Sequence, residues 1–275
     1  MSQSPKLPKS KITQFQAQIW AFYAHSGRKM PWRNTRNAYK ILVSEIMLQQ
    51  TQVSRVLEKY PEFLKRFPDI ESLAKSPLSE VLHVWQGMGY NRRALALKRM
   101  AEKIVTEHKG KIPRSRTELE LLPGVGPYTA GAVRAFAFNE AEVFIETNIR
   151  RAFIHHFFTR RREVSDQEIL SLVQKMLDTK NPREWYYALM DYGAHLPKIT
   201  KTNSNKQSKH YLKQSTFKGS LRELRGKIIR GLNGEASTLP SIKKISNDDP
   251  RTKEVLEVLK KEGLIKYEKR KYQLA

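Results

Sequence analysis

The stretch LPGVGPYTA, residues 122–130, is the part of the chain around which the rest is organised. An apolar-periodic run over residues 116–122 precedes it, and a run rich in alanine and valine over residues 129–138 follows it. Two glycines two residues apart let the backbone take conformations that a Cβ blocks, and the proline after them suits the first turn of a helix. The amides of such a turn, with a helix N-terminus behind them, form a site for a phosphate. The stretch therefore predicts two helices joined by a tight turn, which is either a clamp on a nucleic-acid backbone or a plain connector.

The composition of the 275-residue chain is strongly basic, with 51 lysines and arginines against 27 acidic residues and a net charge of +24. Such an excess indicates a polyanionic partner, either nucleic acid or an anionic membrane surface. No apolar run reaches the length that spans a membrane, and the N-terminus lacks a hydrophobic signal region. We therefore expect an intracellular protein, cytoplasmic or associated with the nucleoid, that binds DNA or RNA. The absence of cysteine excludes disulfides, thiolate-bound zinc and iron-sulfur clusters.

The hydrophobic periodicity predicts an all-α main domain, because few segments alternate as strands do before residue 260. A proline in the segment MPWR interrupts the pattern after the first helix. Beside the two helices of the central turn, we expect helices over residues 12–25, 39–50, 52–67, 70–74, 77–85, 92–108, 142–158, 166–177 and 182–196.

The character of the chain changes after residue 197. Residues 198–218 hold six lysines and no acidic residue, which indicates a linker or an exposed loop. Helices are expected over residues 221–232, 239–245 and 251–262, and a small hairpin around the polar turn EKRK follows them. We therefore expect a basic tail at 1–11, a helical main domain at 12–197, a linker at 198–218 and a winged-helix-like module at 219–275. This module either contacts DNA or packs on the main domain.

Glu45 is the most informative acidic residue of the chain. It shares a helical stripe with Ile41, Leu42 and Leu48, so it is expected on a buried or half-buried face. Burial disfavours the charged form of a carboxyl, raises its pKa and suits it to act as a general acid near neutral pH. The alternative is a structural glutamate paired with an arginine. Gln49, Gln50 and Thr51 end the same helix, where they either enter a duplex to satisfy unpaired bases or are ordinary polar residues of a helix end.

Five motifs occur in one order along the chain: MPWR at 30–33, SEIMLQQTQV at 44–53, GMGYNRRA at 87–94, LPGVGPYTAGA at 122–132 and ALMDYGA at 188–194. Together they resemble the helix-hairpin-helix DNA glycosylases, and within these the adenine glycosylases of the MutY type. The resemblance covers about residues 12–196. It implies a core of two helical subdomains and removal of adenine mispaired with 8-oxoguanine or guanine in double-stranded DNA, with the adenine flipped into a pocket.

The resemblance implies a role for each of four residues. Glu45 matches the glutamate that protonates adenine N7 and makes the base a better leaving group, which favours adenine over a pyrimidine. Tyr128 stands where bifunctional relatives place a lysine that forms a Schiff base. A tyrosine cannot form an imine, so a monofunctional enzyme without β-elimination by that route is expected. Asn148 matches the asparagine that supports the catalytic carboxylates.

Glu146 is a departure from the family pattern. An aspartate that stabilises the sugar cation usually stands there, followed by glycine and asparagine, whereas this chain has Glu146-Thr147-Asn148. The carboxylate is kept but lies one methylene further from the backbone. A misplacement of about 1 Å can lower a rate by ~10²-fold, so a slower or differently tuned site is expected. Arg150 and Arg151, just beyond, either contact phosphate or are solvated.

The resemblance also implies contacts with DNA. Tyr90 matches the aromatic residue that enters the duplex beside the base opposite adenine, and Gln50 and Thr51 match residues that fill the gap. Arg28 and Arg33 match basic residues near the pocket. The hairpin residues expected to offer amides to a phosphate, with a structural cation on nearby main-chain carbonyls in this family, are Gly124, Val125 and Gly126.

Two further departures concern whole segments. MutY-type enzymes carry four cysteines that hold a [4Fe-4S] cluster after the ALMDYGA segment, whereas this chain has a lysine-rich stretch there. Larger members add a C-terminal domain that reads 8-oxoguanine, and a winged-helix-like module of about 60 residues replaces it here. We expect a monomer without a catalytic cofactor, a catalytic metal or a membrane partner. A uracil or thymine mismatch glycosylase of the same fold, and a non-catalytic DNA-binding relative, are the alternatives.

Overall fold

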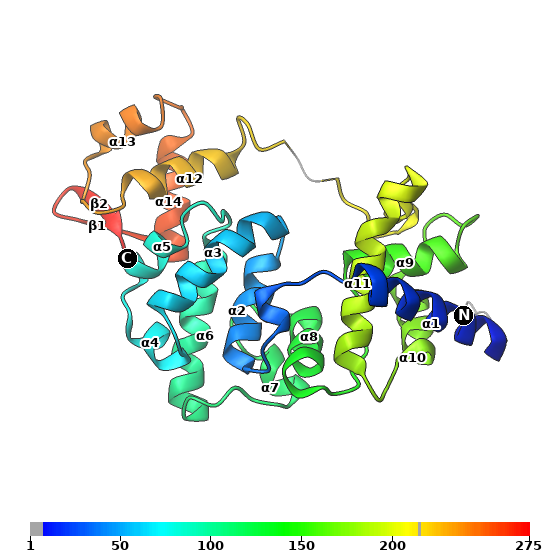
Figure 1. Ribbon diagram of the computed structural model, residues 1–275. Coiled ribbons are helices and arrows are strands. Elements are labelled where there is room, and N and C mark those ends of the chain that lie inside the picture. The colour runs from blue at the N-terminus through cyan, green and yellow to red at the C-terminus, as the bar shows by residue number, and fades with distance from the viewer. Residues whose placement is uncertain (1–7, 214–215) are drawn as a thin grey trace. The chain divides into compact units, whose positions relative to one another are not determined.

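The computed structural model describes residues 8–213 and 216–275, so the first seven residues of the expected basic tail lie outside it. The chain forms two compact units, each assembled from separate stretches of sequence. The first unit comprises residues 1–41, 114–120 and 125–213, and the second comprises 42–113, 121–124 and 214–275. Helices dominate both units (Figure 1). The expected all-α class is confirmed.

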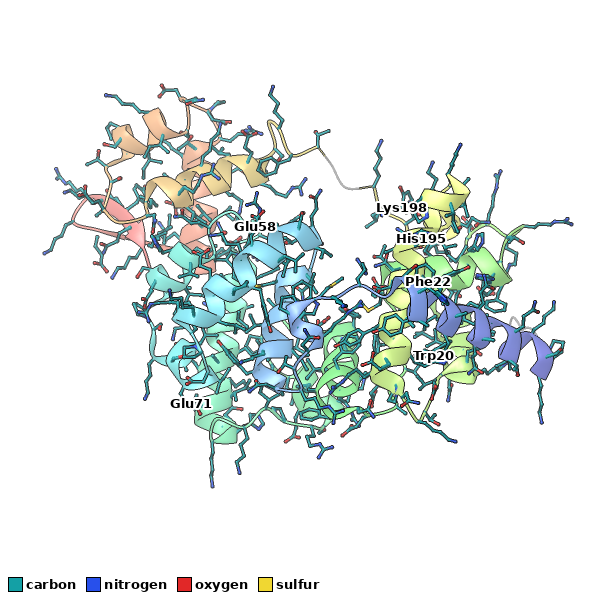
Figure 2. All side chains as sticks on the ribbon, in the orientation of Figure 1. Trp20, Phe22, Glu58, Glu71, His195 and Lys198 are labelled. Carbon is teal, nitrogen blue, oxygen red and sulfur yellow. The ribbon has the colours of Figure 1, made fainter. Side chains whose placement is uncertain are left out.

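Aromatic side chains form the core of the first unit. Helix α11 packs along α9 and α1, and ring pairs connect them: Phe15 lies 5.3 Å from Phe153, and Trp20 lies 5.7 Å from Trp185, between centroids. Phe22, labelled in Figure 2, is 5.1 Å from a histidine ring of α11. The elements of this unit are α1 (Lys9–Ser26), η1 (Pro31–Arg33), α7 (Arg116–Glu120), α8 (Pro127–Phe138), α9 (Thr147–Phe157), α10 (Asp166–Met176), α11 (Pro182–Thr200) and η2 (Ser204–Gln207).

Helix α2 (Ala38–Leu48) begins in the first unit and continues into the second. In the second unit, α6 is the central helix, because most of its apolar residues recur at helical spacing and are buried. It packs against α4 and α5. The other elements of this unit are α3 (Val53–Arg66), α4 (Ile70–Lys75), α5 (Leu78–Val84), α6 (Arg92–His108), α12 (Leu221–Gly231), α13 (Leu239–Ile245), α14 (Thr252–Glu262), β1 (Ile265–Glu268) and β2 (Lys271–Leu274).

The C-terminal module, residues 216–275, has the three helices and the hairpin that the sequence predicts. Gly263 ends α14 in the left-handed conformation, with φ of 79°. Strands β1 and β2 pair antiparallel in the register Ile265↔Leu274, and Glu268↔Lys271 is the last pair. The two residues between these strands both have positive φ, which is the geometry of a two-residue hairpin turn. These features fit a winged-helix-like module.

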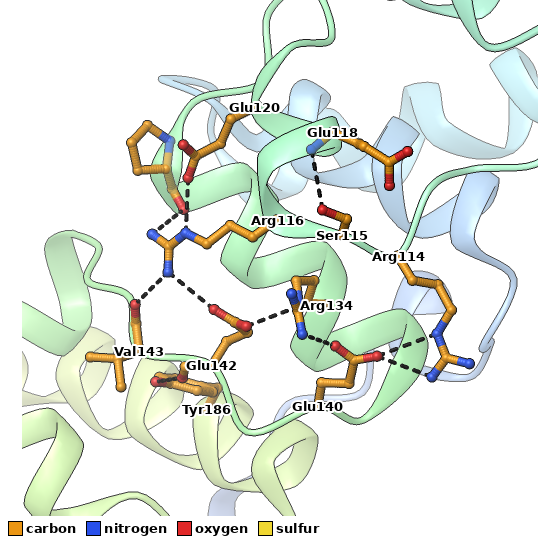
Figure 3. Close-up of polar contacts among 11 residues, drawn as sticks. Arg114, Ser115, Arg116, Glu118, Glu120, Arg134, Glu140, Glu142, Val143 and Tyr186 are labelled. Carbon is orange, nitrogen blue, oxygen red and sulfur yellow. Dashed lines mark hydrogen bonds and ion pairs between the residues drawn. The ribbon is translucent and has the colours of Figure 1, made fainter. Parts of the chain in front are cut away.

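The predicted helix over residues 142–158 is wrong in its first turn, because α9 begins at Thr147. Two acidic side chains hold the preceding segment in an extended form (Figure 3). Glu142 forms ion pairs with Arg116 of α7 at 3.0 Å and with Arg134 of α8 at 2.9 Å, and Glu140 pairs with Arg134. The hydroxyl of Tyr186 donates to the main-chain oxygen of Glu142 at 2.5 Å. Tertiary ion pairs thus override the local helical pattern.

The stretch expected to be a linker is partly regular structure. Helix α11 continues to Thr200, and η2 lies directly after it. Asn205 of η2 is buried, and Ser208 forms a parallel bridge with Val164. Because these residues pack in the first unit, the linker prediction is wrong for residues 198–208.

Within residues 8–213 and 216–275, no helix is both long and apolar enough to cross a membrane.

Candidate active site

Glu45 lies on α2 in the second unit, with a side chain that is 3% exposed. Its neighbours in sequence, Ser44 and Ile46, are equally buried, so this part of the helix is enclosed on all sides. The expectation of a buried face for Glu45 is therefore confirmed. An acidic residue on such a helix is rare unless it serves a structural partner or a reaction.

Arg93 holds the end of α2 in place, and the sequence analysis missed it. Its Nη1 donates to the main-chain oxygens of Ile46, Met47 and Gln49 at 2.9, 2.9 and 2.6 Å. Its Nη2 donates to the hydroxyl of Thr51 at 2.9 Å and to the two carbonyls of the Met88-Gly89 turn at 3.0 and 3.1 Å. Burial lowers the pKa of Arg93 to about 10. One side chain thus joins the turn after α2 to the turn before α6.

Both of these turns contain a non-glycine residue in the left-handed region. Gln50 has φ of 54° and Tyr90 has φ of 47°. This conformation is uncommon for residues with a Cβ, and such strain persists where the surrounding structure enforces it, often at functional sites. Gly87 and Gly89, with φ of 84° and 67°, supply the same conformation at no steric cost. The sequence predictions for Gln50 and Tyr90 thus fall on two strained turns that one arginine connects.

In the first unit, Glu146 is the N-cap of α9. Its Oε1 accepts from the main-chain amides of Asn148 and Ile149 at 2.7 and 2.8 Å, and its Oε2 accepts from the side-chain amide of Asn148 at 3.1 Å. Burial is the largest influence on the pKa of Glu146 and raises it, while these bonds and the charges of Arg151 and Arg150 act in the opposite direction. The longer side chain therefore folds back onto the helix end that a shorter cap normally occupies.

Three contacts hold the start of α9. Arg151 donates from Nη1 to the side-chain oxygen of Asn148 at 2.7 Å and to the carbonyl of Gly193 at 2.8 Å. A Cβ on Gly193 would collide with the main chain of Asn148, so α11 approaches α9 as closely as a glycine permits. Asn205 of η2 donates to the carbonyl of Thr147 at 2.9 Å. Arg151 is thus half-buried and bonded to α9 and α11, and the buried Asn205 is a positioning residue that the sequence analysis missed.

Arg28 and Arg33 meet on Asp191 of α11. Arg33 donates from both terminal nitrogens to the carboxylate at 2.8 and 2.7 Å, and Arg28 donates from Nε and from its amide, each at 2.7 Å. The Asp191 side chain is 1% exposed and that of Arg33 is 8% exposed. Burial alone would raise the pKa of Asp191, but the hydrogen bonds and charges of the two arginines outweigh it and lower that pKa. Asp191 lies within the motif ALMDYGA, but the sequence analysis did not identify it as the partner of the two arginines.

In the central turn, Gly124 has the conformation that a glycine predicts, whereas Gly126, with φ of −100° and open space at the Cβ position, does not require a glycine. Gly124 has φ of 79°, and a Cβ there would lie 2.9 Å from that of Ala96 on α6. Gly126 is the N-cap of α8, followed by a proline in the first turn. Val125 between them is buried. Tyr128, half-buried at the start of α8, lies 5.8 Å from the ring of Phe144 in an edge-on arrangement.

The family model for "HhH-GPD superfamily base excision DNA repair protein" matches residues 43–177. A thymine/uracil-DNA glycosylase of Methanothermobacter thermautotrophicus is 30% identical over 210 residues, which are 74% of this chain and 95% of that protein. The chain belongs to this HhH-GPD superfamily.

Two other similarities refine the comparison within the superfamily. The adenine DNA glycosylase of Buchnera aphidicola subsp. Baizongia pistaciae is 35% identical over 225 residues, which cover 78% of this chain and 63% of the relative. The chain thus spans less than two thirds of that relative's length. The solved structure of a thermostable thymine-DNA glycosylase matches with a TM-score of 0.62 and 28% identity, over 74% of this chain and 97% of that one.

An iron-sulfur cluster does not fit this HhH-GPD chain, because it has no cysteine to bind one. The residues that follow ALMDYGA instead form the end of α11 and η2, and Asn205 there contacts α9 through a hydrogen bond. Within the part of the chain that the structure describes, no group of three or more histidine, aspartate or glutamate side chains is arranged to hold a metal ion. The structural cation expected at the hairpin stays a prediction.

The site residues that the sequence predicts fall into two groups, one in each unit. Glu146, Asn148 and Tyr128 belong to the first unit, together with both arginines of the Asp191 cluster. In the second unit, Arg93 connects the turn after α2 to the Tyr90 turn. The residues of this second group are Glu45, Gln49, Gln50, Thr51 and Tyr90.

Proposed function

We propose that this protein is a monofunctional DNA glycosylase that excises adenine opposite 8-oxoguanine or guanine in double-stranded DNA. The observation that carries the proposal is the buried carboxyl of Glu45 on α2, within a chain 35% identical to an adenine DNA glycosylase. Adenine leaves poorly as an anion, so an acid that protonates the base lowers the barrier to bond cleavage. Glu45 is the residue to which we assign this proton transfer.

Glu146 and Asn148 are assigned to the sugar. The oxocarbenium-like species that forms as the bond breaks is cationic, and a fixed carboxylate stabilises it electrostatically. Both oxygens of Glu146 are oriented by amides at the start of α9, so the negative charge has a defined position. Asn148 supplies two of these hydrogen bonds and is itself oriented by Arg151.

Tyr128 supports a hydrolytic reaction without strand cleavage. An imine between enzyme and sugar requires an amine, and the phenol of Tyr128 cannot form one. Borohydride, which reduces such imines to stable amines, should therefore trap no covalent complex between the protein and DNA. A trapped complex would contradict the monofunctional assignment.

A thymine or uracil mismatch glycosylase is the second candidate. The thymine/uracil relative is matched over 95% of its length, a larger share than that of the Buchnera adenine glycosylase. Glu45 argues for adenine, because protonation of the leaving base is the role that the resemblance gives to a carboxyl there.

The deciding experiment is single-turnover base release on four duplexes that contain A:8-oxoG, A:G, U:G or T:G, with alkali added to reveal abasic sites. The Glu45→Gln protein is compared with Glu58→Gln, which makes the same chemical change at an exposed glutamate of α3 (Figure 2). We expect cleavage of the adenine duplexes only after alkali, a loss of at least ~10²-fold in Glu45→Gln and an unchanged rate in Glu58→Gln. Release from U:G or T:G alone would assign the enzyme to pyrimidines instead.

A further inference from the structure

A cavity of about 600 Å³ lies in the second unit between the C-terminal module and the turn that carries Tyr90. One wall is the segment from Gln86 to Arg92 together with Gln50, and the facing wall is α12 with Phe217 before it. The two strained residues of the candidate site, Gln50 and Tyr90, both line this cavity. The C-terminal module thus shares a concave surface with residues assigned to the opposite strand of the duplex.

Arg222 of α12 joins the two walls. Its Nη1 donates to the hydroxyl of Tyr90 at 2.5 Å, and its guanidinium carbon lies 5.5 Å from the centroid of the same ring. Arg93 approaches that ring from the main domain, also at 5.5 Å. The orientation of Tyr90 therefore depends on one arginine of α12 and one arginine of α6.

Gly226 keeps the cavity open. It lies inside α12, where glycine destabilises a helix by about 1 kcal/mol relative to alanine. Of the described residues, none has an atom within 4 Å of the position that a Cβ on Gly226 would occupy. Packing within the protein does not require a glycine there. Because Gly226 has no side chain, the cavity wall is flat at this position.

The chemistry of the lining is that of a nucleotide site. Its charged residues are four arginines of α6 and α12 and a single glutamate, Glu262 of α14, which pairs with Arg225 at 2.5 Å. Arg230 near the C-terminal end of α12 is exposed, and Phe217, which precedes α12, is 59% exposed. Arginine guanidinium groups bind phosphate, and an exposed aromatic ring stacks on a base.

We propose that α12 and the Tyr90 turn form a binding site for one nucleotide of the bound DNA, with Phe217 against its base and the arginines on its phosphate. The C-terminal module is then part of the DNA-binding surface and not only a packing partner of the main domain. The choice of DNA as the source of that nucleotide rests on the proposed function. Arg222 is a positioning residue, because it acts through Tyr90.

Fluorescence anisotropy with a labelled A:8-oxoG duplex tests this proposal in the full-length protein. Gly226→Leu places a branched side chain in the cavity, Phe217→Ala removes the exposed ring and Arg230→Ala removes a cation. Lys253→Ala, an exposed position of α14 outside the cavity, is the control for a lost positive charge. We expect affinity to fall on the order of tenfold in Gly226→Leu and Phe217→Ala, and by more in Arg230→Ala than in Lys253→Ala. Thermal unfolding establishes that each variant is folded.

Equal affinity of folded Gly226→Leu, Phe217→Ala and Lys253→Ala would overturn the proposal. Titration with free dGMP separates the two sources of a nucleotide, which are the bound DNA and a free nucleotide. If the protein binds dGMP, and Gly226→Leu abolishes this binding but leaves the duplex affinity unchanged, the assignment to DNA is overturned. Base release on the same duplex distinguishes this inference from the proposed function. A wild-type protein that binds through the cavity but releases no base would support the nucleotide site and contradict the glycosylase assignment.

Discussion

At the scale of single residues, the candidate site depends on polar side chains that are buried and hydrogen-bonded. Arg93, Asp191 and Asn205 are each enclosed, and each connects segments far apart in the sequence. A buried polar group of this kind has a large effect when its partner is removed, because the remaining group loses both water and its hydrogen bonds. Mutations at these positions therefore test how the candidate site is held together.

Asp191→Asn should destabilise the fold by about 3–5 kcal/mol, because it leaves the buried guanidinium of Arg33 without its counter-charge. The free energy of unfolding in urea measures the change. Asp248→Asn, at an exposed position of the C-terminal module, is the matched control and should lie within about 0.5 kcal/mol of the wild type. A similar stability for both variants would show that the ion pairs contribute little.

His156 should make stability depend on pH below neutrality. Burial, and then the charge of His155, lower the pKa of His156 from 6.5 to about 4. Between pH 6.5 and pH 4, His156 therefore binds a proton in the unfolded chain but not in the folded chain. The stability that is present above pH 6.5 is lost as the pH falls toward 4. Tyr192 accepts a hydrogen bond from Gln18 and lies 2.7 Å from Nε2 of His156, which suits a neutral ring that accepts the phenol proton.

Urea unfolding at pH 7 and pH 5 measures this dependence. His156→Gln removes the titrating group, so the loss of stability between the two pH values should be smaller than in the wild type. His25→Gln, at an exposed position of α1, serves as the comparison and should keep the wild-type dependence. An identical pH dependence in His156→Gln would assign the effect to other groups.

At the scale of elements, the start of α9 is positioned by three neighbours in addition to its own N-cap, Glu146. The ion pairs of Glu140 and Glu142 hold the preceding segment extended, α11 approaches through Gly193, and η2 contacts Thr147. The lysine-rich stretch that the sequence analysis took for a linker supplies one of these supports. The carboxylate of Glu146 is thus placed by packing between helices.

Gly193→Ala should reduce base release by up to ~10²-fold, because the added carbon moves the start of α9 and a displacement of about 1 Å is costly at a catalytic group. Single-turnover rates measure the loss, and anisotropy should show a much smaller change in DNA affinity. A wild-type rate in a folded Gly193→Ala protein would indicate that α9 can shift without consequence for Glu146.

At the scale of the whole molecule, the net charge of +24 should govern the proposed association with DNA. Each phosphate that a lysine or arginine neutralises releases counterions and contributes about −0.9 to the slope of log K against log salt. Contacts with four or more phosphates predict a slope steeper than about −3, or a loss of roughly 10²-fold in affinity between 50 and 200 mM salt. Anisotropy over this range measures the slope, and a value near zero would contradict DNA binding through phosphates.

The sequence by itself determined the helical class, most helix positions and the C-terminal hairpin, because hydrophobic periodicity and turn residues act over a few positions. The superfamily followed from the resemblance of five sequence motifs to known DNA glycosylases. The sequence also excluded a thiolate-bound cluster. The burial of Glu45 followed from the spacing of its apolar neighbours, and the structure confirms it. The roles of Glu45, Tyr128, Glu146 and Asn148 stay predictions until base release is measured.

Only the tertiary structure decided how these residues are held. Arg93 reaches the carbonyl of Ile46 across 47 positions, and Arg33 reaches Asp191 across 158. The cavity beside Tyr90 combines residues of α6 and α12 in the same way. No local pattern encodes such pairs, because the sequence separation of two residues does not determine their distance until the helices between them have packed.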